Sequence, residues 1–204
     1  MKLRLEDIRP LCPDVGEELV REHLERLDEE YFQRFDRHAV AGHLQGLSRL
    51  SADHPVELIV AASLEGAVEC TVLAFDYPFE FSLITGVLSS MGFSILSGDI
   101  FTYERPATGP VPTDARHSPG RDPKKTVDPL RRRRIIDHFS GTRDSRIPFH
   151  EWAEELRKRM AEIIGYLEID EKDAVTRTKH RVNEWVTDRL AEIQTSQLPV
   201  LYPV

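Results

Sequence analysis

Four polar side chains in this sequence have types that could support metal or acid–base chemistry. Asp137 and His138 are adjacent, and aspartate–histidine pairs ligate metal ions in phosphohydrolases. They lie in residues 131–141, which predict a strand, and neighbouring side chains of a strand point to opposite faces. His38 and His43 are five positions apart and therefore do not share one face of a helix. We expect neither pair to hold a metal ion.

The sequence carries none of the common catalytic motifs. It has no Gly-x-x-x-x-Gly-Lys phosphate loop, no Gly-x-Ser-x-Gly elbow, and no paired aspartates after a Gly-Ser turn that would hold magnesium for nucleotidyl transfer. Cys70 lies in a predicted strand with no base beside it, and neither Cys12 nor Cys70 has a partner at zinc spacing. We therefore expect no enzyme, no catalytic residue, no metal and no cofactor.

Composition narrows the class of protein. The chain has 204 residues, of which 40% are hydrophobic, and a net charge of -8. The acidic balance argues against nucleic-acid binding as a function, because that function needs a basic face. No long apolar run predicts a membrane span, and the first residues lack an apolar signal region. The two distant cysteines favour a reducing compartment, so we expect a cytoplasmic protein.

The most structured stretch is residues 68–103. Residues 68–75 are β-branched and apolar and predict a strand, which the Asp76-Tyr77-Pro78 turn ends. A helix should follow, with Gly92 as its stop, and then a second strand over residues 93–103. A strand–helix–strand unit of this kind predicts a crossover that joins two parallel strands of one sheet.

The flanking residues predict further elements. We expect an extended lead-in over residues 1–13, and a hairpin at Gly66 that joins a strand over 56–63 to residues 68–75. Three helices should precede the hairpin, capped by Asp14, Asp28 and Asp36. After the strand at 131–141 we expect helices over 149–167 and 170–193, and an extended apolar tail over 198–204.

This order resembles the first half of an ACT domain: apolar strand, Asp-x-Pro, helix ending in Gly, and second strand. ACT domains are βαββαβ modules of ferredoxin-like topology that commonly bind amino acids and regulate enzymes of nitrogen and amino-acid metabolism. Residues 31–35, followed by His43, resemble the segment before the paired ACT domains of bacterial PII-uridylyltransferases. Residues 131–141 resemble the third ACT strand.

The resemblance implies an α+β fold, a ferredoxin-like (βαββαβ) ACT domain with added helices. The expected parts are an N-terminal helical segment at 1–52, the ACT-like domain at 53–165 with a disordered insertion at about 104–129, and a C-terminal helix with an extended tail at 166–204. The fourth ACT strand would come from the tail. Alternatively, the chain is a fragment of a larger regulator that continues into a second ACT domain.

The resemblance also implies a function and a site. The function would be that of a non-catalytic regulatory module that senses a small molecule, such as the amino acid glutamine. Its ligand would bind near the turn, at Asp76, Tyr77, Phe79, Glu80 and Phe81, where Phe79 replaces the usual glycine of the family. In the alternative interpretation, Asp76 only caps the helix and Phe79 packs in the core. The alternative function is a ligand-free dimerisation or docking module, which pairs with a second copy or a second ACT domain.

Three further features carry open alternatives. His43 is interpreted as a packing histidine bonded to a backbone carbonyl, rather than as a ligand or a sensor. The proline-rich insertion is either a solvated loop or a partner-binding arm. The four arginines at 131–134 either protect an edge strand from aggregation, which we favour, or bind nucleic acid.

Overall fold

The structure is a computed structural model that describes residues 3–62, 66–104, 133–144, 146–168 and 173–196. The predicted insertion at 104–129 and the predicted tail at 198–204 fall almost wholly outside the described residues. The elements, in chain order, are α1 (Leu5–Ile8), a 3-10 turn (Arg9–Leu11), α2 (Glu17–Arg26), α3 (Glu29–Arg34), α4 (Arg37–Ser48), β1 (Val56–Ala62), β2 (Val68–Phe75), α5 (Glu80–Ser90), β3 (Phe93–Thr102), β4 (Arg134–Arg143), α6 (Phe149–Glu168) and α7 (Ala174–Ser196).

The four strands form one antiparallel sheet in the order β1-β2-β4-β3. Strands β2 and β3 are both antiparallel to β4, so they are parallel to each other and α5 is the crossover between them. The predicted strand–helix–strand unit is therefore confirmed, and so is the β1–β2 hairpin, where Gly66 has a φ of +83°. Gly92 ends the connection after α5 at a φ of +69°, a conformation that favours glycine.

The order of the elements differs from the predicted βαββαβ. It is ββαββαα after the N-terminal helices, and no fourth strand follows α6 among the described residues. The hairpin brings β1 to the edge of β2 directly, so this edge is already paired. The residues after α6 keep a helical pattern and form α7. The α+β class is confirmed, whereas a complete βαββαβ order is not present among the described residues, and the tail that was predicted to supply the last strand lies outside them.

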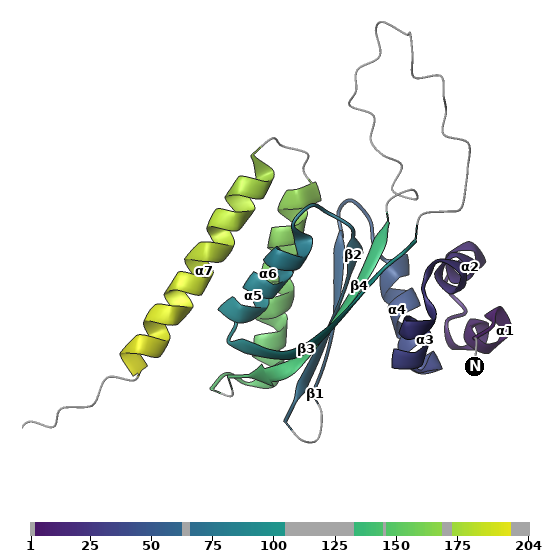
Figure 1. Ribbon diagram of the computed structural model, residues 1–204, viewed down its shortest axis with the longest axis horizontal. Coiled ribbons are helices and arrows are strands. Elements are labelled where there is room, and N and C mark those ends of the chain that lie inside the picture. Colours follow the sequence, from purple (N-terminus) through teal and green to yellow (C-terminus); the bar gives the residue numbers. More distant parts are fainter. Residues whose placement is uncertain (1–2, 63–65, 105–132, 145, 169–172, 197–204) are drawn as a thin grey trace, which may run out of the picture.

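The sheet lies between two layers of helices, as Figure 1 shows, and a hydrophobic core lies on each of its faces. Helices α5 and α6 cover one face of the sheet, and α7 packs outside them against α5. Helices α1–α4 cover the other face. Helix α4 approaches β2 closely: a Cβ atom at Gly46 would lie 2.3 Å from Leu73 Cδ1. The segment at 1–52 thus completes the second core together with the sheet.

Some N-terminal details differ from expectation. Residues 5–11 are helical rather than extended, with Pro10 at the start of the 3-10 turn, where its missing N–H costs nothing. The caps at Asp28 and Asp36 are confirmed, but Gly16 rather than Asp14 precedes α2. No helix in the described part of the chain has both the length and the apolar character needed to cross a bilayer.

The arginine run does not protect an edge. Strand β4 lies inside the sheet, between β2 and β3, so that interpretation was wrong. Arg134 is buried and donates to Glu22 at 2.8 Å, with its guanidinium 5.8 Å from the centre of the Tyr103 ring. Arg133 forms an ion pair with Asp76. Both described arginines therefore join elements that are distant in sequence, while Arg131 and Arg132 lie outside the described residues.

Candidate functional site

The turn before α5 is built differently from either sequence interpretation. Asp76 does not cap the helix, because its side chain accepts from Arg133. Helix α5 begins only after Phe79, which has a left-handed φ of 66° and is 57% exposed. The predictions that Asp76 caps α5 and that Phe79 packs in the core are both wrong. Pro78 disfavours a helical conformation at Tyr77, and the left-handed Phe79 places the helix start at Glu80.

Two buried carboxyl groups, Glu80 and Asp137, lie behind this turn near the exposed Asp76, and we call these three residues the acid cluster. The Tyr77 backbone N–H donates to Glu80 Oε2 at 3.2 Å, while Glu80 Oε1 and Asp137 Oδ1 are buried without a partner among the described residues. Burial raises the pKa of Glu80 to about 9, and the charges of Asp137 and Asp76 add to this effect. Burial also raises the pKa of Asp137 to about 7. Both groups are therefore largely or partly protonated near neutral pH.

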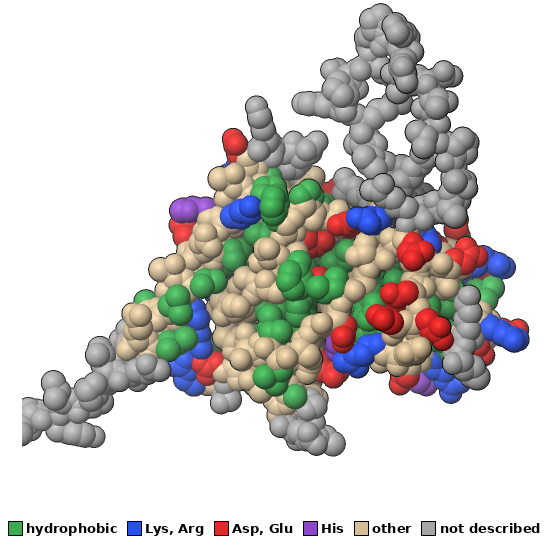
Figure 2. Space-filling model, viewed as in Figure 1, with side chains coloured by type: hydrophobic (Ala, Val, Ile, Leu, Met, Phe, Trp, Pro, Cys, Tyr) green, Lys and Arg blue, Asp and Glu red, His purple; other side chains and the backbone are tan. Residues whose placement is uncertain are grey.

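The remaining predicted site residues lie at the edge of the acid cluster. Tyr77 donates its hydroxyl hydrogen to Glu168 of α6. Phe81 is 47% exposed, and its ring stacks on Phe139 with centroids 6.1 Å apart. The structure thus brings Asp76 and Glu80 together, and it leaves Phe79 and Phe81 at the surface. Leu96 and Ile100 on β3 are also exposed. Hydrophobic side chains are visible at the surface in the middle of Figure 2.

A second site, which we call the histidine pocket, lies on the opposite face of the sheet, between α3, α4 and strands β1, β2 and β4. Its volume is about 490 Å³. That volume is in the range of small-molecule sites. Its lining combines aromatic and small side chains with histidines and charged groups: Arg34, Phe35, Asp36, His38, Ala39, Gly42, His43, Ile59, Ala61, Glu69, Thr71 and His138.

His138 is the most unusual group in the histidine pocket. It is buried, its Nδ1 atom is hydrogen-bonded to Thr71 Oγ1 at 2.9 Å, and its Nε2 atom is buried with no partner among the described residues. Burial lowers its pKa, so the ring is neutral near pH 7. Asp137, its neighbour in β4, points to the other face and into the acid cluster. The prediction that these two residues cannot share a metal ion is consistent with this arrangement.

A chain of buried hydrogen bonds leads to the pocket from the end of β3. The Tyr103 hydroxyl is 2.7 Å from His23 Nδ1, and His23 Nε2 is 3.0 Å from the Tyr31 hydroxyl. The Tyr31 hydroxyl is in turn 2.7 Å from His43 Nδ1. The prediction that His43 bonds a backbone carbonyl is wrong, because its partner is this hydroxyl. We call these four residues the tyrosine–histidine relay.

Both histidines of the relay are held neutral. Burial lowers the pKa of His23 to about 3, and the charges of His43 and Arg134 add to this effect. Burial also lowers the pKa of His43 to about 4, with a further contribution from His138. The imidazoles therefore act as neutral hydrogen-bonding groups, each with one N–H donor and one acceptor nitrogen.

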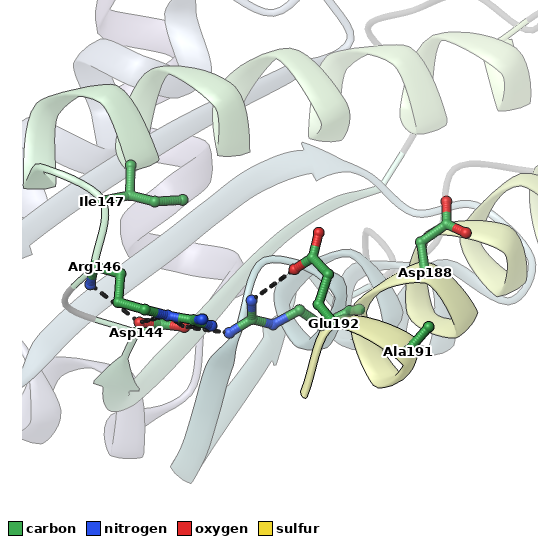
Figure 3. Close-up of a pocket in the computed structure, with 7 residues that line it drawn as sticks. Asp144, Arg146, Ile147, Asp188, Ala191 and Glu192 are labelled. Carbon is green, nitrogen blue, oxygen red and sulfur yellow. Dashed lines mark hydrogen bonds and ion pairs between the residues drawn. The ribbon is translucent and has the colours of Figure 1, made fainter. Parts of the chain in front are cut away.

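Another pocket, shown in Figure 3, lies between α7 and the loop before α6 and has a volume of about 870 Å³. Asp144 lies between two guanidinium groups there, 2.5 Å from Arg146 Nη2 and 2.5 Å from Arg189 Nη2. Arg189 also donates to Glu192 at 3.0 Å. The hydrogen bonds from Arg146 and Arg189 hold the pKa of Asp144 well below its usual range. Because these charges neutralise one another, this pocket is a weaker candidate than the histidine pocket.

Comparisons with known proteins do not assign the chain to a family. Comparison with protein-family models and with curated proteins finds no match. Within the described ranges, no three His, Cys, Asp or Glu side chains are placed to hold a metal ion together.

Proposed function

We propose that this protein is a non-catalytic regulatory module that binds a small molecule in the histidine pocket. The observation that carries the proposal is the unpartnered Nε2 atom of His138, buried at the wall of a pocket of about 490 Å³. A buried polar atom without a partner is costly, and a ligand that hydrogen-bonds to it removes that cost. The pocket also lies between the N-terminal helices and the sheet, so a bound ligand contacts both.

The ACT resemblance suggests the biological setting. Elements β2, α5, β3, β4 and α6 follow the order of the first five elements of a βαββαβ module. On that basis we propose a role in nitrogen or amino-acid metabolism, as a relative or part of a PII-uridylyltransferase, with an amino acid such as glutamine as one candidate ligand. The predicted turn is a less favourable binding place than the histidine pocket, because Asp76 is already paired with Arg133.

A second candidate function is an assembly module without a ligand. It is favoured by exposed apolar side chains near the start of α5 and on β3: Phe79, Phe81, Leu96 and Ile100. Strand β3 is also an edge of the sheet among the described residues, and the backbone of an edge strand is a ready pairing surface.

A thermal-shift screen tests the proposal and separates the two functions. The probes are the common amino acids, nucleotides and small organic acids, and the mass in solution is measured alongside. We expect at least one compound to raise the melting temperature, because binding to the folded state alone stabilises it by mass action.

Two variants then locate the site. The shift should be lost in His138→Phe, which removes the ring nitrogens, and kept in Asp76→Ala. A shift that is lost only in Asp76→Ala would place the ligand at the turn instead. A screen without any shift, together with a stable dimer, would contradict the proposal and favour the assembly module.

A further inference from the structure

The hydrogen positions in the tyrosine–histidine relay follow from counting donors and acceptors. Each tyrosine hydroxyl has one hydrogen, and His23 Nδ1 is the only acceptor that the described residues offer to Tyr103. His23 then carries its hydrogen on Nε2 and donates it to the Tyr31 oxygen. Tyr31 donates to His43 Nδ1. His43 must therefore carry its hydrogen on Nε2, which has no partner among the described residues.

The same accounting applies to His138. The Thr71 hydroxyl has no other acceptor among the described residues, so it donates to His138 Nδ1. His138 therefore also carries its hydrogen on Nε2, the buried atom without a partner. The Phe35 ring contacts both histidines, with its centroid 4.7 Å from that of His43 and 5.2 Å from that of His138. Two histidines that line the pocket thus each carry an N–H donor without a partner among the described residues, and the natural partner of such a donor is an oxygen acceptor.

The charged groups around the pocket restrict that acceptor further. Arg34 is paired with Asp99 at 2.8 Å, and Asp36 Oδ1 accepts from the backbone of α4. Glu69 also lines the pocket and is exposed. Arg37 and His38 lie close enough to Asp36 to lower its pKa, whereas no ion pair of Glu69 occurs among the described residues, so Glu69 opposes a second negative charge on a ligand.

We propose that the histidine pocket binds the carboxylate of a small monocarboxylic acid, whose oxygens accept from Nε2–H of His43 and His138. This inference rests on the proposed function and names its ligand class. Neutral donors that are already oriented bind an oxyanion without reorganisation, and hydrogen bonds to an ionised acceptor are stronger than those to a neutral one. The relay fixes the donor at His43 from inside the core, and Thr71 fixes the donor at His138.

Calorimetric titration of the full chain with three matched probes tests the inference. The probes are propionate, its neutral analogue propionamide, and the dicarboxylate succinate. We expect propionate to bind most tightly, with a Kd about tenfold or more below that of propionamide, because the amide oxygen is uncharged. Succinate should bind more weakly than propionate, because its second carboxylate is repelled by Glu69, which lines the pocket.

Variants link the binding to the two donors. His138→Phe should raise the Kd for propionate by about tenfold or more. Thr71→Val, of nearly the same shape, should also raise it, because it removes the hydroxyl that fixes the tautomer of His138. His180→Ala is the control: this histidine is exposed on α7, beside Glu184, and its loss should leave the Kd unchanged.

Equal binding of propionate and propionamide, or propionate binding that neither His138→Phe nor Thr71→Val weakens, would overturn the inference. Binding of other compounds in the broad screen, without any carboxylate, would also overturn it while the proposed function stands. A screen in which nothing binds would overturn both.

Discussion

Replacement of Glu80 by glutamine should stabilise the protein near neutral pH. Burial raises the pKa of Glu80 in the folded protein to about 9, whereas its ordinary value is 4.5. A raised carboxyl pKa contributes stability that is fully present below the unfolded pKa and is lost as pH rises toward the folded pKa. Between pH 4.5 and pH 7 the parent protein should lose about 3 kcal/mol of unfolding free energy through this group. Glutamine is neutral in both the folded and the unfolded state, and it keeps an oxygen acceptor for the Tyr77 N–H. The variant therefore loses no unfolding free energy through this position as the pH rises.

Urea unfolding at a series of pH values measures this difference. The unfolding free energy of Glu80→Gln minus that of the parent should grow by about 3 kcal/mol over this interval. The buried histidines contribute an opposite slope in both proteins, so they cancel in the difference. Glu154→Gln, on the exposed side of α6, is the control and should show no such growth. A difference for Glu80→Gln that does not change with pH would mean that the carboxyl ionises alike in both states.

Removal of the Tyr31 hydroxyl should be strongly destabilising. This oxygen joins His23 Nε2 at 3.0 Å and His43 Nδ1 at 2.7 Å, and Tyr31 is fully buried. Tyr31→Phe keeps the ring that packs on Phe35 and Phe101, but it leaves two buried nitrogens without partners. We expect a loss of about 2–4 kcal/mol in unfolding free energy at neutral pH.

Tyr166→Phe is the matched control for the relay. Tyr166 is 40% exposed on α6, and loss of its hydroxyl should change stability by less than about 0.5 kcal/mol. Denaturant unfolding of both variants, at one pH, gives the comparison. Equal stabilities of Tyr31→Phe and Tyr166→Phe would show that the relay does not hold the N-terminal helices to the sheet.

The local elements could be predicted from the sequence because their signals are local. The apolar run of β2, the stop at Pro78, the apolar spacing of α5 and the glycine at 92 all act within a few residues. The order of the strands could not be predicted in this way. Strand β4 lies between β2 and β3 through pairings that no short-range pattern encodes, such as Thr71 with His138. The α+β class and the succession of strands and helices from residue 56 to α7 were therefore predicted correctly, whereas the complete βαββαβ order was not found among the described residues.

The candidate site was largely beyond sequence reasoning for the same reason. Its relay joins positions 23, 31, 43 and 103, and its second donor is at 138. No spacing rule connects residues so far apart. The sequence did indicate one part of the site, because the alternation of side chains along β4 places His138 on the face opposite Asp137. The turn at Asp76 was found by its motif, but its partner Arg133 lies 57 positions away.

The tautomers of His43 and His138 test the central claim most directly. The measurement is a long-range ¹⁵N–¹H NMR correlation of the histidine ring nitrogens in the ligand-free protein, at about pH 7. Both rings should be neutral, with the hydrogen on Nε2, and so present two N–H donors to the pocket. Hydrogens on Nδ1, or charged rings, would contradict the account, because the pocket would then not present a pair of neutral donors to an oxygen acceptor.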